Sequence, residues 1–464
     1  MSFPSGFTWG VATSAYQIEG GRTDGKGQSI WDTFSDQGRL RDRGDLACDH
    51  YHRWPEDVEL MRQAGITSYR FSIAWTRVLP DGDGEVNRAG LGFYDRLVDG
   101  LLAAGIEPWL TLYHWDLPQA LQDRGGWANR DSVGWFLRYT DVMAKALGDR
   151  VRHWITHNEP WVAVTLGHID GSFAPGVRDW RRGLAAGHHI LLSHGQAVPL
   201  IRASSPGARV GIALDCRPAT PATLDPADMA ACRYFDGFRN RWYFDPIFGR
   251  GYPADIAAIY RERGRWSDEL ANSGDLETIA APVDFVGVNY YTSLEVAVGG
   301  EESESGPVPP GPKAPAGYTE MGWKITPGAL TDFLIRITTE YRPARIVITE
   351  NGASYSDSPG PDGRVHDQRR IDYLAAHIAA VEGALAAGAP VSGYFVWSLL
   401  DNLEWTSGFS QRFGLVHVDH ESLVRTPKDS LHWYGKVATA NALDAKSAMG
   451  TSEPRLDPGR NSAR

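Results

Sequence analysis

Short apolar segments alternate with segments of helical periodicity along most of the chain. Eight of the apolar segments have the length and composition of β-strands, and they cover residues 7–15, 68–75, 106–114, 151–159, 209–216, 284–292, 345–350 and 391–401. Several are apolar almost throughout, as expected for strands of a parallel sheet that is buried on both faces. The pattern therefore predicts an α/β protein with a parallel sheet.

Helical periodicity lies between the predicted strands. One helix is predicted from apolar residues at helical spacing, namely Ile371, Leu374, Ile378, Val381 and Leu385. A second is predicted from Leu91, Tyr94, Leu97, Leu101 and Leu102, with Asn87 as its N-cap and Gly105 after its end. Eight βα units in 464 residues predict a single (β/α)8 TIM barrel. A doubly wound sheet is the alternative, but the glycine-rich turn that it normally carries after its first strand is missing here.

The ends of the predicted barrel and its longest loop follow from composition. We expect one catalytic barrel over residues 1–448, followed by a polar, flexible C-terminal tail over residues 449–464. Residues 299–317 are rich in glycine, proline and serine, so we expect an exposed loop there.

Charge and cysteine content exclude several classes of protein. The net charge of −11 argues against nonspecific binding to nucleic acid or to an anionic membrane. The 3 cysteines form neither a disulfide framework nor a zinc-binding spacing. No leader-like segment and no apolar run of membrane-spanning length are evident, which favours a cytoplasmic protein. Either a monomer or a homo-oligomer is compatible with this composition.

Polar and tryptophan side chains stand at or just after the carboxyl ends of the predicted strands. In a barrel these ends surround the active site, and here they carry Gln17, Arg70, His114, Asn158, Glu159, Asn289, Tyr290, Tyr291, Glu350, Asn351, Trp397, Glu404 and Trp405. Glu159 ends the fourth strand and Glu350 the seventh, so we expect both carboxyl groups to face each other across the barrel and to flank one substrate bond. Paired carboxylates are what glycosidic bond cleavage requires. The 17 tryptophans suit the binding of a flat sugar ring.

Five sequence motifs closely resemble those of glycoside hydrolase family 1, the β-glucosidases. They are Gln17-Ile18-Glu19-Gly20, Tyr113-His114-Trp115-Asp116-Leu117-Pro118, Thr156-His157-Asn158-Glu159-Pro160, Ile348-Thr349-Glu350-Asn351-Gly352 and Trp397-Ser398-Leu399-Leu400-Asp401-Asn402-Leu403-Glu404-Trp405. The resemblance runs from Phe7 to about Tyr434. It implies a (β/α)8 barrel, a retaining mechanism, no metal or organic cofactor, and small β-glucosides or cello-oligosaccharides as substrates.

The resemblance also implies a role for each matching residue. Glu159 would be the general acid/base and Glu350 the nucleophile. The glycone hydroxyls would be bound by Gln17, His114, Asn158, Glu404 and Trp405, with Trp397 beneath the sugar ring. Asn289, Tyr291 and Arg70 would surround the nucleophile, Trp323 would line the aglycone side, and Phe413 would complete the substrate site. Two neighbouring positions depart from the family pattern, Leu403 in place of phenylalanine and His157 in place of a bulky apolar residue.

The two glutamates need different protonation states. At the separation of ~5 Å that a retaining enzyme requires, two carboxylates repel each other and one pKa rises. We expect Arg70 and the Tyr291 hydroxyl to keep Glu350 ionised, so that Glu159 holds the proton.

Three other functions fit these residues less well than a β-glucosidase does. A phosphoglycosidase of the same family is disfavoured because a carboxylate at Glu404 would repel a phosphate, and a thioglucosidase is disfavoured because Glu159 is present. A non-catalytic sugar-binding protein would not need both glutamates.

Three local patterns are interpreted as structural. Residues 20–27 approach a phosphate loop but lack its Ser/Thr. His188, His189 and His194 are predicted to be helix residues and not metal ligands, and Cys216 to be a residue of the barrel wall.

Overall fold

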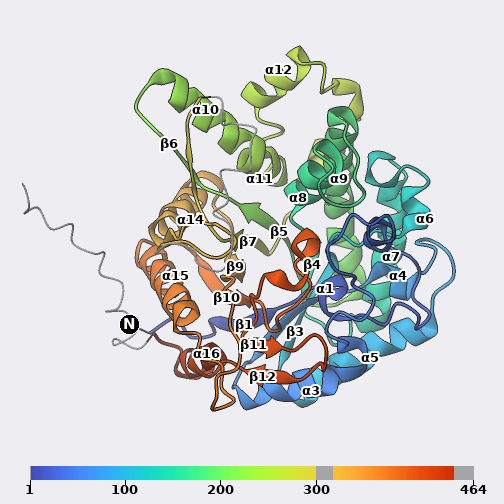
Figure 1. The fold of residues 1–464 in the computed structure, drawn as a ribbon. Helices are drawn as coiled ribbons and strands as arrows, with labels where there is room; N and C mark the ends of the chain where they lie inside the picture. The colour runs from blue at the N-terminus through green and yellow to red at the C-terminus, as the bar shows by residue number, and fades with distance from the viewer. Residues whose placement is uncertain (1, 299–316, 444–464) are drawn as a thin grey trace, which may run out of the picture.

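The computed structural model describes residues 2–298 and 317–443, and its centre is a closed barrel of eight parallel strands (Figure 1). In order around the ring they are β1 (Thr8–Ala12), β2 (Ser68–Ser72), β3 (Glu107–Tyr113), β4 (His153–Asn158), β5 (Arg209–Cys216), β7 (Phe285–Tyr290), β9 (Ile346–Asn351) and β10 (Val391–Trp397). Every segment predicted as a strand overlaps one of them, and only β9 extends beyond its predicted segment, by one residue. The closed ring confirms the (β/α)8 barrel and rules out the doubly wound sheet.

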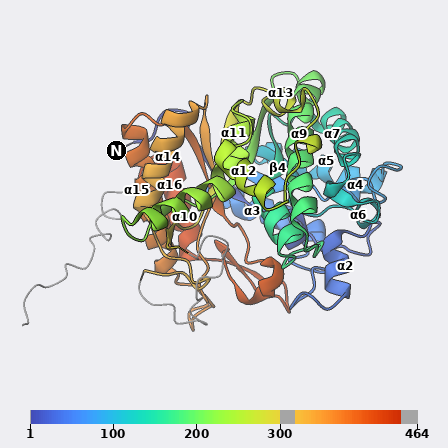
Figure 2. The ribbon, with the colours of Figure 1, turned by 90° about the horizontal axis from the view of Figure 1, so that it is seen from above.

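Long helices surround the barrel. They are α3 (His50–Gln63), α5 (Arg88–Ala103), α7 (Ser132–Leu147), α9 (Trp180–Ser204), α14 (Pro327–Tyr341), α15 (Gln368–Ala386) and α16 (Asp429–Ala440). Figure 2 shows α14, α15 and α16 on one side of the barrel and α5, α7 and α9 on the other. Both predicted helices are confirmed as α5 and α15, and the Asn87 side chain caps α5 by accepting a hydrogen bond from the Ala89 N–H at 3.2 Å.

Shorter elements lie in the connections. The helices are α1 (Ala15–Ile18), α2 (Ile30–Asp36), α4 (Trp75–Val78), α6 (Gln119–Gln122), α8 (Pro160–Val164), α10 (Pro226–Asp236), α11 (Trp242–Ile247), α12 (Ala254–Glu262) and α13 (Asp275–Ile279). Strands β6 (Ala219–Pro221) and β8 (Leu294–Val296) form one small sheet, and β11 (Val416–Val418) and β12 (Arg425–Pro427) form another. Two π-helical turns, η2 (Thr165–Ile169) and η3 (Gly237–Arg241), follow α8 and α10.

The interior of the barrel is filled by side chains and is not a pore. Trp109 of β3 lies 5.3 Å from the ring of Phe285 and 5.0 Å from that of Phe395, and all three are buried. This aromatic layer closes the barrel below the carboxyl ends of the strands, as side-chain layers do in this fold. A second, larger apolar layer packs the strands against the surrounding helices.

The three histidines lie on helix α9, as predicted, and their side chains are buried within the helix layer. His188 bonds to Asp275 at 2.9 Å, His189 to the Trp127 carbonyl at 2.8 Å, and His194 to the Thr156 hydroxyl at 2.7 Å. Within residues 2–298 and 317–443, no cluster of three His, Cys, Asp or Glu side chains could hold a metal ion. No helix in the same ranges is long and apolar enough to cross a membrane.

Two sequence expectations fall outside the described residues. These are nearly all of the expected loop at 299–317 and the whole expected tail at 449–464. The boundary at residue 448 therefore stays a prediction.

A buried ion pair fastens the first long helix to the last small sheet. Asp57 of α3 accepts hydrogen bonds from Arg425 at 3.0 Å and bonds to His50 at 2.7 Å. We expect Asp57→Ala to lower the free energy of unfolding by about 3–5 kcal/mol, because it leaves the buried Arg425 charge without its partner. Denaturant unfolding measures this. Glu59→Ala on the same helix removes an exposed pair with Arg62 and should leave the transition where it is; equal effects of the two changes would contradict the prediction.

Candidate active site

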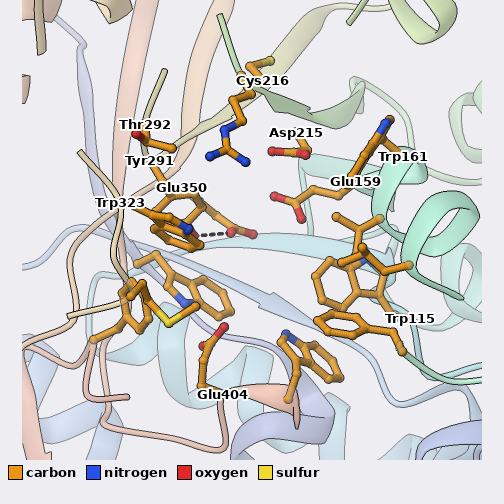
Figure 3. Close-up of a pocket in the computed structure, with 18 of the residues that line it drawn as sticks. Trp115, Glu159, Trp161, Asp215, Cys216, Tyr291, Thr292, Trp323, Glu350 and Glu404 are labelled. Atoms are coloured by element: carbon orange, nitrogen blue, oxygen red, sulfur yellow. Dashed lines mark hydrogen bonds between the residues drawn. The ribbon is translucent and has the colours of Figure 1, made fainter. Parts of the chain in front are cut away.

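Glu159 and Glu350 are placed at the rim of the barrel by two different local structures. Glu350 is part of β9 and lies opposite Asn289 of β7 in the strand register. Glu159 follows β4 directly, in the left-handed region at φ 48°, and Pro160 begins α8 after it. The Glu159 N–H donates to the Ala213 carbonyl of β5 at 2.8 Å, which fixes this turn against the next strand. Both carboxyl groups are buried and line one cavity of about 930 Å³, its open mouth included (Figure 3).

The two glutamates are closer around the ring than a diametric arrangement would place them. The sequence suggested that their strands face each other across the barrel, but only β5 and β7 separate β4 from β9. The Asn289 amide of β7 spans this gap. Its Nδ2 donates to Glu159 Oε1 at 2.7 Å and to Asn158 Oδ1 at 3.0 Å. Asn158 is also bonded to Arg70, and Arg70 is bonded to Glu350, so both carboxyl groups belong to one hydrogen-bond network.

Glu350 is held by a cation and a hydroxyl. Arg70 Nη1 donates to Glu350 Oε1 at 2.6 Å, and the Tyr291 hydroxyl donates to Oε2 at 2.7 Å. Arg70 comes from β2 and is itself fully enclosed, with its second nitrogen donating to Asn158 at 2.5 Å. Both oxygens of Glu350 therefore accept hydrogen bonds, an environment that favours the ionised carboxylate.

The surroundings of Glu159 favour the opposite state. Burial raises the pKa of Glu159 well above its usual range, and the nearby carboxylates of Asp215 and Glu350 raise it further. Burial also raises the pKa of Glu350, but there Arg70 and the Tyr291 hydroxyl oppose the rise. The pair is thus unequal in the way the sequence analysis expected, with the proton favoured on Glu159.

One wall of the cavity is polar and carries Glu404 and His114. Burial, with the Glu350 charge, raises the pKa of Glu404 to about 8. Burial lowers the pKa of His114 well below its usual value, so its imidazole is neutral. Its Nε2 is bonded to Asn158 at 3.1 Å, whereas its Nδ1 has no hydrogen-bond partner among the described residues. A hydroxyl group of a ligand would satisfy this buried nitrogen.

Gln17 is placed differently from the other predicted sugar-binding residues. It is fully buried and does not line the cavity, and its amide donates to the Leu403 carbonyl at 2.9 Å and toward Glu404 at 3.4 Å. Its oxygen accepts from Ser14 at 2.6 Å. In this structure Gln17 supports Glu404 from behind, and direct contact with a sugar stays a prediction.

Aromatic rings form the remaining walls. Trp405 packs among other rings, with its ring centre 4.4 Å from that of Trp31 and 4.6 Å from that of Trp115. The ring centre of Trp397 of β10 lies 5.8 Å from that of His114. At the opposite side, Trp323 lies 5.1 Å from Tyr291 and 6.1 Å from Phe413. Figure 3 shows Trp323 on the side of Glu350 and Trp115 on the side of Glu159.

The predicted residues fall into two layers. Those that line the cavity are His114, Glu159, Tyr291, Trp323, Glu350, Trp397, Glu404, Trp405 and Phe413. Arg70, Asn158 and Asn289 are buried next to them and connect the two glutamates, as described above. The two departures from the family pattern lie outside the cavity lining, because Leu403 is part of the helix–strand core and His157 packs on Phe136 at 4.3 Å.

Sequence reasoning missed one side of the cavity. It is lined by Trp161 and Val162 of α8, Leu166 of η2, Arg239 of η3, and Phe173, Asp215, Arg217 and Thr292. Most of these follow a strand by several residues, where no strand-end signal applies. Asp215 and Arg217 are different, since Asp215 is the last residue but one of β5 and Arg217 follows the strand directly, so that the strand-end rule would have selected both. Cys216, interpreted as a wall residue, is buried in the wall beside it, and burial raises the pKa of its thiol well above the usual value.

A (β/α)8 barrel with two unequal buried carboxyl groups and aromatic walls at its carboxyl rim defines the protein as a glycoside hydrolase. The chain belongs to glycosyl hydrolase family 1, whose family description matches residues 1–443.

Relatives and solved structures agree with this assignment. Beta-glucosidase A of Thermotoga maritima is 45% identical over 95% of this chain and 99% of its own length. A bifunctional beta-D-glucosidase/beta-D-fucosidase of Bifidobacterium breve is 41% identical over 94% of this chain and 97% of its own. The structure of the Thermotoga maritima beta-glucosidase in complex with deoxynojirimycin superposes with a TM-score of 0.89, at 44% identity, over 96% of this chain and 100% of that one.

Proposed function

We propose that the protein is a retaining β-glucosidase that removes terminal non-reducing β-D-glucosyl residues from small β-glucosides or cello-oligosaccharides. The observation that carries the proposal is the unequal pair of carboxyl groups. Arg70 and Tyr291 hold Glu350, whereas among the described residues the Glu159 carboxyl group is bonded through one oxygen to the Asn289 amide alone. A nucleophile must be ionised and an acid must be protonated at the same pH, and these surroundings favour that division.

The first step forms a covalent bond to Glu350. The Glu350 carboxylate attacks the anomeric carbon, and the bond from that carbon to the glycosidic oxygen breaks. Glu159 gives its proton to the departing oxygen, so the aglycone leaves as a neutral alcohol. Asn158 lies next to the acid in sequence and is held by Arg70 and Asn289. We assign it to the sugar hydroxyl beside the reacting carbon.

The second step uses the same pair with reversed roles. Once Glu350 is esterified it has no negative charge, so one of the two carboxylates that raise the pKa of Glu159 is gone. Glu159 then accepts a proton from water, the water oxygen bonds to the anomeric carbon, and the ester bond to Glu350 breaks. Two inversions leave the product in the β configuration.

Glucose recognition is assigned to the polar wall and its aromatic neighbours. Glu404, supported by Gln17, and the unbonded Nδ1 of His114 offer hydrogen-bond partners to hydroxyl groups. Trp397 supplies a flat apolar face, and the indole of Trp405 an N–H donor. The named activities of the relatives support a glucosidase, and the relative from Bifidobacterium breve supports fucosides as a second glycone.

The other candidate functions find less support. A sugar 6-phosphate needs cationic partners, and the polar wall offers the buried carboxyl group of Glu404 in their place, which disfavours a phosphoglycosidase. A non-catalytic sugar-binding protein would have no use for the paired environment of Glu159 and Glu350.

The test is a panel of nitrophenyl glycosides that differ only in the sugar, followed by NMR of the product. We expect the β-glucoside to be hydrolysed and the anomeric proton of β-glucose to appear first, before mutarotation produces the α anomer. First appearance of α-glucose would contradict the retaining mechanism. Failure of the whole β-glycoside panel, with the protein folded, would contradict the enzyme class.

A further inference from the structure

Asp215 is a buried carboxyl group of the cavity that the proposed mechanism does not use. The strand register brings it to the level of the catalytic pair, because Asp215 of β5 lies opposite Asn289 of β7, and Asn289 in turn lies opposite Glu350 of β9. Asn289 also donates to Glu159. Figure 3 shows the Asp215 carboxyl group beside that of Glu159. Four neighbouring strands thus bring three carboxyl groups to one rim.

Asp215 forms an ion pair with a buried arginine, Arg239. Arg239 lies on the π-helical turn η3, is buried, and donates from Nη2 to Asp215 Oδ2. The next residue fastens this turn to the end of β5, since the Asn240 side chain accepts from the Arg217 N–H at 3.2 Å and donates to the Arg217 carbonyl at 3.1 Å. π-Helical turns are frequent at functional sites because they redirect side chains that a regular helix would point elsewhere.

The same arginine also touches the helix that begins at the acid. The Arg239 guanidinium lies 3.7 Å from the ring centre of Trp161, which is the second residue of α8. Glu159 is the N-cap residue of α8, so Arg239 contacts both Asp215 and the helix that follows Glu159. The ion pair is therefore part of the surroundings that fix Glu159.

We propose that Asp215, held by Arg239, is a positioning residue that sets the charge around Glu159 and so keeps the acid protonated in the working pH range. The inference rests on the proposed acid/base role of Glu159. Burial raises the pKa of Asp215, and the Arg239 guanidinium opposes this rise, so that a carboxylate is tolerated in a buried wall where an uncompensated charge would be costly. Asp215 then acts on Glu159 through space and touches no reacting atom.

The sign of the effect follows from the groups that face Glu159. These are Asp215 and the Cys216 thiol of β5, Glu350 of β9, Tyr291 after β7, the Asn289 amide, and Arg239 of η3, with Arg217 and Tyr243 close to Asp215. Negative charge on Asp215 disfavours a second negative charge on Glu159, so Glu159 keeps its proton to higher pH. Removal of the Asp215 charge, with Arg239 left in place, shifts the balance toward ionised Glu159.

The test is the pH dependence of kcat/KM for phenyl β-glucoside in three variants. In Asp215→Asn the side chain keeps its shape, and we expect the basic limb of the profile to move to lower pH by about one unit while the acid limb stays. In Asp215→Asn combined with Arg239→Gln, both charges are lost, and the basic limb should return toward its wild-type position. Asp245→Asn is the matched control, because Asp245 is a buried carboxyl group bonded to Tyr341 outside the cavity, and its profile should be unchanged.

Two results would overturn the inference. A basic limb that does not move in Asp215→Asn, or a uniform fall of kcat/KM at every pH, would leave Asp215 with a structural role alone. The pH profile of kcat/KM for Glu159→Ala with dinitrophenyl β-glucoside distinguishes an error about Asp215 from an error about the proposed acid/base role of Glu159. If that variant loses the basic limb, the acid assignment stands and only the role of Asp215 is wrong; if the limb persists, the acid assignment is wrong and the inference falls with it.

Discussion

Glu350→Ala is expected to lower turnover of β-glucosides by about 10⁴- to 10⁶-fold, the range found when the nucleophile of a covalent mechanism is removed. Alanine leaves no atom that can bond to the anomeric carbon. It also leaves the Arg70 guanidinium and the Tyr291 hydroxyl facing an empty space large enough for a small anion. Added azide should enter this space, restore turnover of dinitrophenyl β-glucoside, and give the α-glucosyl azide.

The configuration of the azide product makes this result specific. A single displacement from the Glu350 side inverts the anomeric carbon, whereas the mechanism proposed for the wild-type protein inverts it twice and returns β-glucose. Glu340→Ala on the exposed face of α14 is the control and should keep full activity. Undiminished activity of Glu350→Ala, or a β-azide product, would show that another group is the nucleophile.

The second large effect concerns Glu159, the proposed general acid. Glu159→Ala should reduce kcat/KM for phenyl β-glucoside by about 10²- to 10⁴-fold, because the leaving phenolate must depart without a proton. Dinitrophenol needs no such help, so formation of the covalent intermediate from dinitrophenyl β-glucoside should be nearly as fast as in the wild type. Its hydrolysis also loses the base, and the intermediate should accumulate.

The accumulation can be observed directly. Rapid mixing should give a burst of dinitrophenolate equal to the enzyme concentration, followed by slow steady turnover, and mass spectrometry should find one glucosyl group on the protein. The prediction fails if the two substrates lose rate equally. In that case Glu159 would not be the proton donor.

Much of the site followed from the sequence because the fold brings contiguous motifs to one place. Parallel strands of a barrel all end at the same rim, so a glutamate after the fourth strand and another at the end of the seventh must meet there. The periodicity of apolar residues predicted every barrel strand and helices α5 and α15, since burial on both faces leaves a clear pattern. The pairing of Arg70 and Tyr291 with Glu350 was likewise expected and is found.

Side-chain direction was decided only by tertiary packing. Gln17 stands in a matching motif, yet its amide is bonded to Ser14 and to the Leu403 carbonyl inside the protein. His157 precedes Asn158 in the same motif but points into the helix layer, because consecutive residues of a strand face opposite sides. The strands of the two glutamates are three positions apart on the ring and not directly opposite, a fact that strand order fixes and local pattern cannot.

The sequence by itself determined the barrel, its carboxyl rim and the two glutamates, because each depends on periodicity or on a motif within one segment. The tertiary structure alone decided the Asp215–Arg239 pair. Its members lie 24 residues apart in the chain, and the arginine reaches the carboxylate only because a π-helical turn is fastened to the end of β5. Such a contact depends on how two segments pack, and no pattern within either segment records it.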